Sequence, residues 1–319
     1  MRVLVAEPLA DEGLELLRSG HDVDYRPDLA RTDFLGLLPD YDALVVRSGV
    51  KVDAQAIAAG KRLRVVGRAG VGVDNIDVPA ATGAGILVVN APTANTIAAA
   101  ELTVGLIYAL ARHIPQAEAS LRRGEWRRAD FVGTELRGKT LGIIGLGKIG
   151  LAVAQRARAM EMTIIGSDPF VSAEAAAARA IELVEVDHLL RRADIVTLHV
   201  PLNDATRGLI GADRLQLMKP TALVVNVARG GVVDEAALAA ALTDGRLAGA
   251  AVDVYEHEPP MESPLLTAPN TVLTPHLGAS TREAQTKAGV EVAEQVLDAL
   301  AGRPARYAVN SVGAPAVRS

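Results

Sequence analysis

The chain has 319 residues, a net charge of −5 at pH 7 and no cysteine. This length exceeds what one hydrophobic core usually supports, so we expect two domains. The absence of cysteine excludes disulfides, thiolate catalysis and cysteine-based zinc sites, while the negative charge argues against general binding to nucleic acid or to acidic membranes.

The N-terminal stretch does not have the pattern of a signal peptide or a membrane span. The apolar start of the chain meets an acid at Glu7, which a signal-peptide core would not contain. The longest apolar helix candidate, 102–111, is too short to cross a bilayer. We therefore expect a soluble, cytoplasmic protein.

Short apolar strands alternate with helices over residues 1–92. We expect strands at 3–6, 22–25, 43–46, 65–67 and 86–89, and helices at 9–17, 32–38 and 53–59. This alternation predicts a small α/β unit with a mostly parallel sheet.

A long apolar helix over 96–113 is predicted to lead into a second, larger α/β domain, in which 121–139 forms a charged, irregular arm around Trp126. The strands of this domain are continuous apolar runs, as expected when helices cover both faces of a parallel sheet. We expect them before Gly145, around 164, and at 195–198, 223–226, 250–252 and 272–273.

Residues 140–168 carry the pattern of a dinucleotide-binding unit. An apolar run leads to Gly145, Gly147 and Gly150, which form GxGxxG at the start of a helix. These glycines permit a tight turn, close approach of a pyrophosphate and close packing of the helix on the strand, and the helix N-terminus favours phosphate. Asp168, 23 residues after Gly145, ends the next strand. Its carboxylate suits ribose hydroxyls but repels a 2′-phosphate, so the pattern predicts NAD rather than NADP.

Three later strands end in polar residues, at the edge where open α/β sheets bind ligands. Arg229 follows one strand and could clamp a carboxylate, although a capping or ion-pairing role fits its position equally well. Asp253 and Glu258 follow the next strand, and His276 follows the last. A single histidine of this kind is more often structural, but an acid, a base and an anion clamp beside a nicotinamide site indicate catalysis.

The last long helix, 281–300, is predicted to return to the first unit, where 309–310 closes the chain and 312–319 forms a loose tail. The predicted fold class is therefore α/β, with two doubly wound parallel-sheet, Rossmann-like domains and an interdomain cleft. We assign 1–94 with 282–319 to a discontinuous substrate-binding domain and 95–281 to an NAD-binding Rossmann domain.

Several motifs spread over residues 43–310 point to one family. They are GLGKIG at 145–150, ADIVTLHVPL at 193–202, NVARG at 226–230, the Glu258 and His276 pair, RSGVKV at 47–52, GRAGVGVDNID at 67–77, and the segment from Asn95 through Leu102. Together they resemble the D-isomer-specific 2-hydroxyacid dehydrogenases. The resemblance implies NAD-dependent oxidation of a small hydroxy acid without a metal.

The resemblance also implies a role for each matching residue. His276 would be the general acid and base, Glu258 would orient it, and Arg229 would hold the substrate carboxylate. The implied cofactor-binding residues are Val71, Gly145, Gly147, Lys148, Ile149, Gly150, Asp168, Val200, Val227, Ala228, Arg229, Asp253, His276, Gly278 and Ala279. The implied substrate-binding residues are Arg47, Ser48, Arg68, Gly72, Asn95, Arg229 and His276. Arg47 and Arg68 would bind a phosphate, unless they pair with nearby acids such as Asp74 or Asp77.

The implied reaction is oxidation of a phosphorylated hydroxy acid, 3-phospho-D-glycerate, to 3-phosphohydroxypyruvate, the first step of L-serine synthesis, by a homodimer or homotetramer. Two alternatives stay open. One is a glyoxylate/hydroxypyruvate reductase or another D-2-hydroxyacid dehydrogenase, and the other is an NAD(H)-sensing, corepressor-like binding protein. Some family members sense serine through C-terminal regulatory domains; this chain ends soon after Asn310, so serine inhibition is not expected of it.

Overall fold

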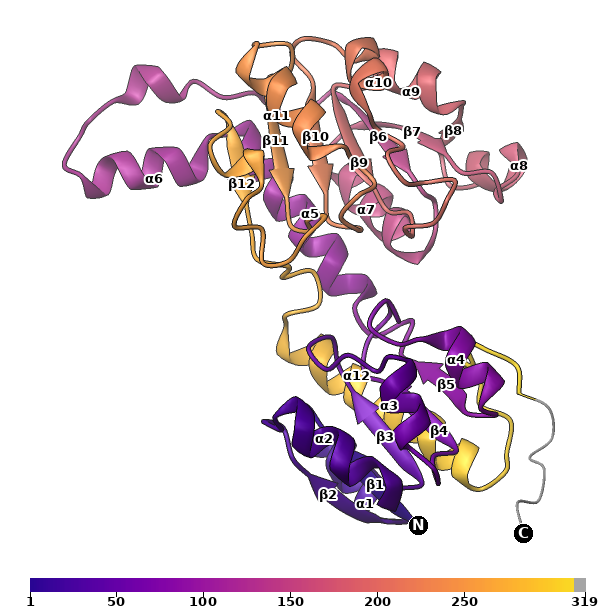
Figure 1. Cartoon of the computed structure of the whole chain (residues 1–319). Coiled ribbons are helices and arrows are strands. Elements are labelled where there is room, and N and C mark those ends of the chain that lie inside the picture. The colour runs from indigo at the N-terminus through magenta and orange to yellow at the C-terminus, as the bar shows by residue number, and fades with distance from the viewer. Residues whose placement is uncertain (313–319) are drawn as a thin grey trace. The chain divides into compact units, whose positions relative to one another are not determined.

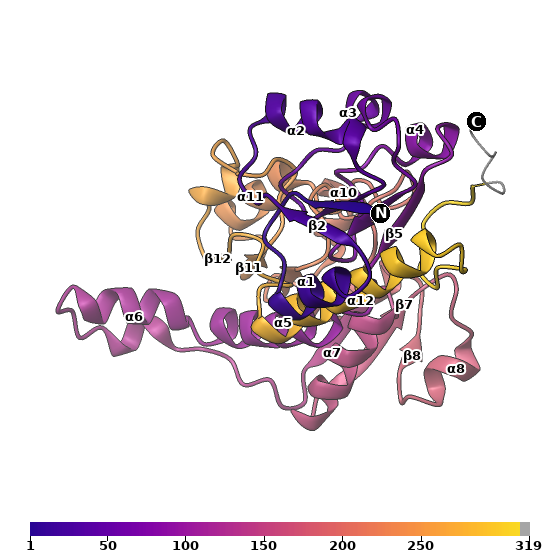
Figure 2. The same cartoon turned by 90° about the horizontal axis from the view of Figure 1, so that it is seen from below.

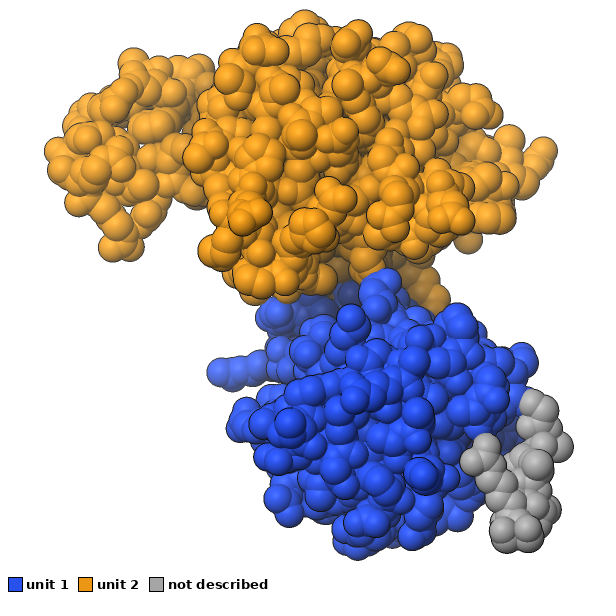
Figure 3. Space-filling model, viewed as in Figure 1, with its two compact units in different colours: residues 1–95, 279–319 blue, residues 96–278 orange. Residues whose placement is uncertain are grey.

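The computed structural model describes residues 1–312, so 313–319 of the predicted tail lie outside the described residues. The chain divides into two compact units (Figure 3). Unit 1 is Met1–Asn95 with the chain from Ala279 onward, and unit 2 is Thr96–Gly278. The boundaries expected from the sequence were 94/95 and 281/282.

Unit 1 is built on a five-stranded parallel sheet (Figure 1). The strand order is β2 (Asp22–Tyr25), β1 (Arg2–Val5), β3 (Ala43–Val46), β4 (Val65–Arg68) and β5 (Leu87–Asn90). Alternate strand residues face opposite sides, so Val3 and Val5 pack into one core and Leu4 into the other. Helices therefore cover both faces of this sheet.

The helices of unit 1 divide between these two cores. The first core is covered by α1 (Asp11–Arg18) and α12 (Arg282–Leu300), and the second by α2 (Arg31–Leu37), the short 3-10 turn η1 (Leu38–Asp40), α3 (Ala54–Ala59) and α4 (Val78–Gly83). Figure 2 shows α1 beside α12 from below. After α12 the chain returns to β5, where the Val309 N–H donates to the Val88 carbonyl at 2.8 Å and closes the unit.

Unit 2 is built on a seven-stranded parallel sheet. The strand order is β12 (Thr271–Leu273), β11 (Gly249–Val252), β10 (Leu223–Asn226), β9 (Ile195–Leu198), β6 (Thr140–Ile144), β7 (Thr163–Ser167) and β8 (Glu182–Leu183). One face is covered by α5 (Thr96–Ala111), α7 (Lys148–Ala159) and α8 (Ala173–Ala177), and the other by α9 (Val186–Arg192), α10 (Ala212–Leu217) and α11 (Glu235–Thr243). Both units are doubly wound parallel sheets, which confirms the predicted fold class.

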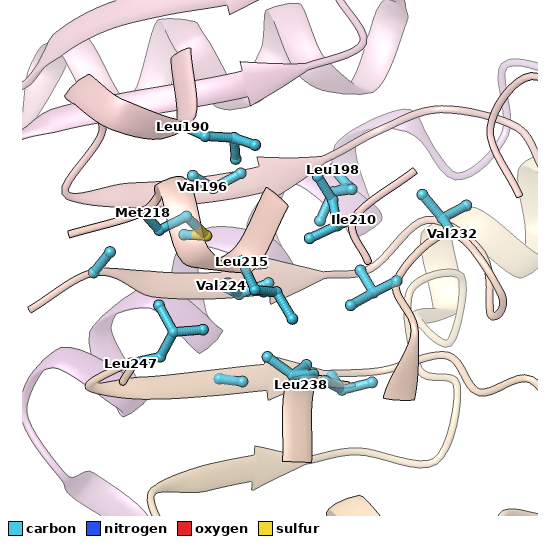
Figure 4. Packing of buried hydrophobic residues seen from close by; sticks show 14 of the residues in the cluster. Leu190, Val196, Leu198, Ile210, Leu215, Met218, Val224, Val232, Leu238 and Leu247 are labelled. Atoms are coloured by element: carbon cyan, nitrogen blue, oxygen red, sulfur yellow. The ribbon is translucent and has the colours of Figure 1, made fainter. Parts of the chain in front are cut away.

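Figure 4 shows how the second of these faces is packed. Leu190 of α9, Leu215 of α10 and Leu238 of α11 pack over Val196 and Val224 of the sheet, and all five are at most 2% exposed. Complete burial of such a side chain contributes about 1.5–3 kcal/mol. This packing fixes strands β9 and β10, whose carboxyl ends lead into polar loops.

The helix predicted over 96–113 is shorter than expected, and the prediction there was wrong. α5 ends at Ala111, His113 takes a left-handed conformation with φ of 52°, and α6 runs from Ile114 to Arg122. Pro115 explains why α5 does not continue, because in one continuous helix it could not donate an N–H to the Ala111 carbonyl and its ring would clash with that carbonyl, whereas Pro is tolerated in the first turn of α6. The arm predicted to be irregular over 121–139 is therefore still helical at 121–122. Beyond α6 it is irregular except for a 3-10 turn, η2, at Arg128–Phe131.

The sequence interpretation also missed the helix α4. Its signals were present: Asp77 caps it by accepting the Ala80 N–H at 2.9 Å, and Pro79 lies in its first turn. The two-residue strand β8 was missed as well, because a run of that length has no periodicity to read.

Within the described residues, no single helix is long and apolar enough to cross a membrane. α5 and α6 reach that length and composition only when taken together, across a bend of 62°.

Candidate active site

The carboxyl edge of the sheet in unit 2 brings the predicted residues of this unit onto neighbouring strand ends. β6 lies between β9 and β7, so the chain moves to opposite sides of β6 and creates the switch point at which doubly wound sheets bind ligands. β10, β11 and β12 follow β9 in order across the sheet. Their strand-end loops carry Arg229, Glu258 and His276.

The glycine-rich turn after β6 has the geometry that its three glycines imply. Gly145 has a φ of +95°, and a Cβ on it would lie 2.5 Å from the carbonyl oxygen of His199. A Cβ on Gly150 would lie 2.0 Å from the carbonyl oxygen of Gly145, so this glycine lets α7 approach the turn. Gly147 has open space where a Cβ would be, and it gives α7 no side-chain cap. The start of α7 therefore fits an incoming phosphate group.

Asp168 lies beside this turn. One carboxylate oxygen accepts the N–H of Leu146 at 2.8 Å, and the other accepts the N–H of Phe170 at 2.8 Å. Each carboxylate oxygen can accept a further hydrogen bond. The neighbours of Asp168, residues 167, 169 and 170, include no basic side chain.

The loop after β10 is fixed by Asn226, which is 2% exposed. Its side-chain oxygen accepts the N–H of Ala228 at 3.1 Å, and its amide donates to the carbonyl of Arg229 at 3.0 Å. The next residue, Gly230, lies against the following loop, because a Cβ there would be 1.9 Å from the carbonyl oxygen of Tyr255. The loops that carry Arg229 and Glu258 therefore pack directly on each other.

Asp253, at the end of β11, holds the loop of His276. The carboxylate is completely buried and accepts hydrogen bonds from Thr274 Oγ1 at 2.6 Å, the Leu277 N–H at 2.7 Å and the Gly278 N–H at 2.9 Å. The Asp253 carbonyl accepts the His276 N–H at 2.9 Å. His276 has a φ of 55°, a conformation that costs a non-glycine residue about 1–2 kcal/mol. The surrounding hydrogen bonds offset that cost.

His276 and Glu258 form a hydrogen-bonded pair. His276 Nδ1 lies 2.7 Å from Glu258 Oε2, while Glu258 Oε1 accepts the Tyr255 N–H at 3.1 Å. This arrangement assigns the proton of the neutral ring to Nδ1 and leaves Nε2 as the basic nitrogen. The His276 side chain is 48% exposed and that of Glu258 38%, so both are accessible from outside unit 2.

The same contacts set the titration of Glu258. Partial burial raises the pKa of its carboxyl, but the hydrogen bonds from His276 and from the Tyr255 N–H outweigh that effect. The positive charges of His276 and Arg229 act in the same direction, so the pKa of Glu258 lies below its ordinary value. The carboxylate is therefore ionised at neutral pH and able to orient and stabilise a protonated imidazole.

The predicted residues of unit 1 form a separate group on the strand ends of its own sheet. Ser48 lies in the loop after β3, whose N–H groups at Arg47, Gly49 and Val50 donate to the Glu7 carboxylate at 2.6–3.1 Å. From the other side of the loop, the Asn75 amide donates to the carbonyls of Arg47 and Val50 at 2.8 and 2.7 Å. This loop is therefore braced from both sides.

Most of the remaining unit 1 residues lie near the ends of β4 and β5. Arg68 ends β4, and its guanidinium lies over Gly70, where a Cβ would be 1.5 Å from Nη1. The Asn90 amide donates to the Val71 carbonyl at 2.6 Å, which fixes the turn that also contains Gly72. The other two are Asn95, directly before α5, and the exposed Ala279.

Four residues with evident structural roles at these edges were not singled out from the sequence. Glu7 was noted only as a charge, and Asn226 only as part of a motif. Asn75 was likewise noted only as part of a motif, and Glu235, which accepts the Glu256 N–H at 2.6 Å, was not noted. A polar residue at or just after the end of a buried strand is a usable signal for Glu7 and Asn226, while Asn75 and Glu235 have no such position.

Comparison with known proteins places these observations in a family. The D-isomer specific 2-hydroxyacid dehydrogenase, NAD binding domain, matches residues 104–278. The chain is 51% identical over 312 residues to a D-3-phosphoglycerate dehydrogenase from Archaeoglobus fulgidus, across 97% of this chain but only 59% of that protein's length.

Two solved structures are similar over almost the whole chain. The TT0316 protein from Thermus thermophilus is 35% identical with a TM-score of 0.89, over 97% of this chain and 100% of that one. A glyoxylate reductase from Paecilomyes thermophila is 34% identical with a TM-score of 0.87, over 97% of this chain and 98% of that one.

Proposed function

We propose that this chain, which belongs to the D-isomer specific 2-hydroxyacid dehydrogenase family, oxidises 3-phospho-D-glycerate to 3-phosphohydroxypyruvate with NAD⁺, the first step of L-serine synthesis. The observation that carries the reaction type is the His276–Glu258 pair at 2.7 Å, next to the loop of Arg229. The name of the Archaeoglobus relative supports the choice of substrate.

The residues of unit 2 suffice for the proton and charge movements of this reaction. His276 Nε2 takes the proton of the substrate C2 hydroxyl, and Glu258 stabilises the imidazolium that results. Arg229 holds the substrate carboxylate through charge-assisted hydrogen bonds. Bound NAD⁺ supplies the acceptor for the hydride that leaves C2.

The cofactor would lie across the switch point of unit 2. Gly145, Gly147, Lys148, Ile149 and Gly150 would bind the pyrophosphate. The residues proposed to line the rest of the cofactor are Val71, Val200, Val227, Ala228, Arg229, Asp253, His276, Gly278 and Ala279. Asp253 also positions His276, because its carboxylate accepts the N–H groups of Leu277 and Gly278 in the same loop.

The preference for NAD over NADP rests on Asp168. Its carboxylate would accept hydrogen bonds from the adenosine ribose and would repel a 2′-phosphate. D168A should therefore lose affinity for NAD⁺ and narrow the NAD⁺/NADP⁺ ratio of kcat/KM. A ratio that stays the same in the variant would mean that the ribose binds elsewhere.

Substrate choice depends on unit 1. Arg47 and Arg68 would bind the phosphate, and Ser48, Gly72 and Asn95 would contact the rest of the substrate. Two guanidinium groups suit a phosphate dianion, which a two-carbon acid such as glyoxylate lacks. The similarity to a glyoxylate reductase favours a second candidate, a reductase for unphosphorylated oxo acids.

One assay separates the two candidates. NADH formation from 3-phospho-D-glycerate and D-glycerate, and NADH consumption with glyoxylate and hydroxypyruvate, would be compared through kcat/KM. The proposal expects the largest kcat/KM for 3-phospho-D-glycerate. A larger value for glyoxylate, or no turnover of any of these acids, would contradict it.

We also propose that the protein forms a homodimer or homotetramer through unit 2. α6 and the segment that follows it project from the body of this unit (Figure 1). They expose apolar side chains that water solvates poorly: Leu121 is 59% exposed, Trp126 77% and Val132 79%. Light scattering of the wild type and of W126S tests this, and a monomeric wild type would contradict it.

A further inference from the structure

Glu235, the first residue of α11, contacts both ends of the loop that carries Glu258. One carboxylate oxygen accepts the Glu256 N–H at 2.6 Å, and the other accepts the hydroxyl of Ser263. Glu258 lies between these two anchors, and residues 256–259 are exposed. A single side chain thus closes the segment 256–263 at its base.

This segment has few other anchors. It contains no helix or strand, and the backbone hydrogen bonds that start within it are two turns, from the Met261 N–H to the Pro259 carbonyl and from the Ser263 N–H to the Pro260 carbonyl, both 3.0 Å. The residue before it, Tyr255, is 6% exposed, and its hydroxyl shares one proton between the carbonyls of Val252 at 3.1 Å and Thr274 at 3.0 Å. Between Tyr255 and the 3-10 turn at Pro264–Leu266, the contacts of Glu235 with Glu256 and Ser263 fix the path of the backbone.

We propose that Glu235 is a positioning residue that keeps the Glu258 carboxylate on His276 Nδ1 by closing the segment 256–263. Without this closure the segment has more conformational entropy. Ordering it to bring the Glu258 carboxylate onto His276 then costs free energy, so the contact is formed less of the time. The catalytic meaning of the inference rests on the proposed function, but the contact between Glu258 and His276 is a property of unit 2 alone.

A purely structural role makes a different prediction. A glutamate in the first turn of a helix stabilises that helix through its dipole, whatever it touches. Asp234 provides the matched control, because it caps the same helix by accepting the Ala237 N–H at 2.9 Å rather than by holding the segment. D234A weakens α11 without opening the segment.

The experiment compares E235A, E235Q, S263A and D234A in the full chain. Alanine at 235 removes both links. Glutamine keeps both, because its carbonyl accepts the Glu256 N–H while its amide donates to Ser263, whose hydroxyl can also accept. S263A breaks one link without altering α11. We expect E235A to lower kcat by about ten- to a hundredfold and S263A to lower it less. E235Q should stay within about twofold of the wild type, and D234A should lower the Tm only.

A readout that needs no substrate accompanies the kinetics. The pH titration of the Glu258 carboxyl, followed by ¹³C NMR, should move upward toward its ordinary value in E235A and stay in place in E235Q and D234A. An unmoved titration in a folded E235A, or a shift of equal size in D234A, would overturn the inference. If the wild type oxidises none of the acids tested, the proposed function fails while this titration still decides the role of Glu235.

Discussion

The loops at the carboxyl edges of the two sheets differ in whether their backbone N–H groups are left for an anion from outside. In unit 2 the turn after β6 carries Gly145 and Gly147 and leads to a helix without a side-chain cap. In unit 1 the turn after β1 carries Glu7, whose carboxylate accepts three N–H groups from the loop after β3. The N–H groups at the start of α7 thus have no side-chain acceptor, whereas the N–H groups of the loop after β3 in unit 1 are occupied by an internal carboxylate.

This difference assigns different means of recognition to the two units. Open N–H groups at a helix N-terminus suit the pyrophosphate of a dinucleotide. In unit 1 the N–H groups of the loop after β3 are already bound to Glu7, so a substrate phosphate at this loop has to be bound by side chains, and Arg47 and Arg68 are the candidates. The comparison predicts that chemistry depends on unit 2 and phosphate affinity on unit 1.

The largest effect should come from the base in unit 2. H276A should lower kcat by roughly 10²–10⁴, the usual contribution of general acid–base catalysis, and should leave NADH binding nearly intact. Stopped-flow turnover and NADH fluorescence titration measure the two quantities. If the variant kept more than about a tenth of the wild-type rate of the chemical step, His276 would not be the base.

The next effect should come from unit 1 and should appear only with a phosphorylated substrate. Charge-assisted hydrogen bonds contribute on the order of 1.5–3 kcal/mol, so R68A should raise the KM for 3-phospho-D-glycerate about ten- to a hundredfold. Turnover of D-glycerate should change little. R62A is the control, since Arg62 lies in the same unit and pairs with Asp42 at 3.0 Å.

Two outcomes would contradict the prediction that chemistry depends on unit 2 and phosphate affinity on unit 1. Equal losses of R68A on both substrates would mean that Arg68 serves the fold or the substrate carboxylate. A loss in R62A as large as that in R68A would mean that the effect is one of general charge.

The fold and the residue types of the site could be predicted from the sequence. The long-range hydrogen bonds that hold the loops of the site, such as those of Glu235 and Glu7, could not. Mainly apolar runs such as 195–198 and 223–226 identified the strands, because strands that are buried on both faces do not alternate apolar with polar residues. The roles given to Arg229, Glu258 and His276 stay predictions until they are tested. Glu235 and Glu256 are 21 residues apart, Glu7 and Arg47 40, and no local pattern links them.

The bracing of the unit 1 loop gives a third prediction. E7Q keeps one carbonyl oxygen but turns an amide group toward backbone donors, so part of the three hydrogen bonds is lost. We expect the free energy of unfolding to fall by on the order of 1–2 kcal/mol, measured by urea denaturation. E15Q, on the exposed side of α1, is the matched control and should have no effect. An unchanged stability of E7Q would show that water replaces the carboxylate, and the comparison of the two turns would lose its basis.

The smallest expected effect is a loss of stability of unit 2 as the pH falls. His199, whose carbonyl lies against Gly145, is partly buried, and burial lowers the pKa of its ring to about 3. The folded state therefore keeps the ring neutral, while the unfolded chain protonates it below about pH 6.5. Stability is complete above that pH and is lost progressively as the pH falls toward 3, with about 1.4 kcal/mol lost by pH 5.5.

Hydrogen exchange corrected for intrinsic rates can assign this loss to one unit. Amides of unit 2 should lose protection between pH 7.5 and 5.5, whereas unit 1, whose only histidine is the partly exposed His21, should lose less. H199Q should remove most of the pH dependence of unit 2, because glutamine does not titrate and can still reach Thr197, which lies 3.0 Å from His199 Nε2. Equal loss of protection in both units would mean that sensitivity to acid does not distinguish unit 2 from unit 1. If H199Q kept the full pH dependence, a group other than His199 would be responsible.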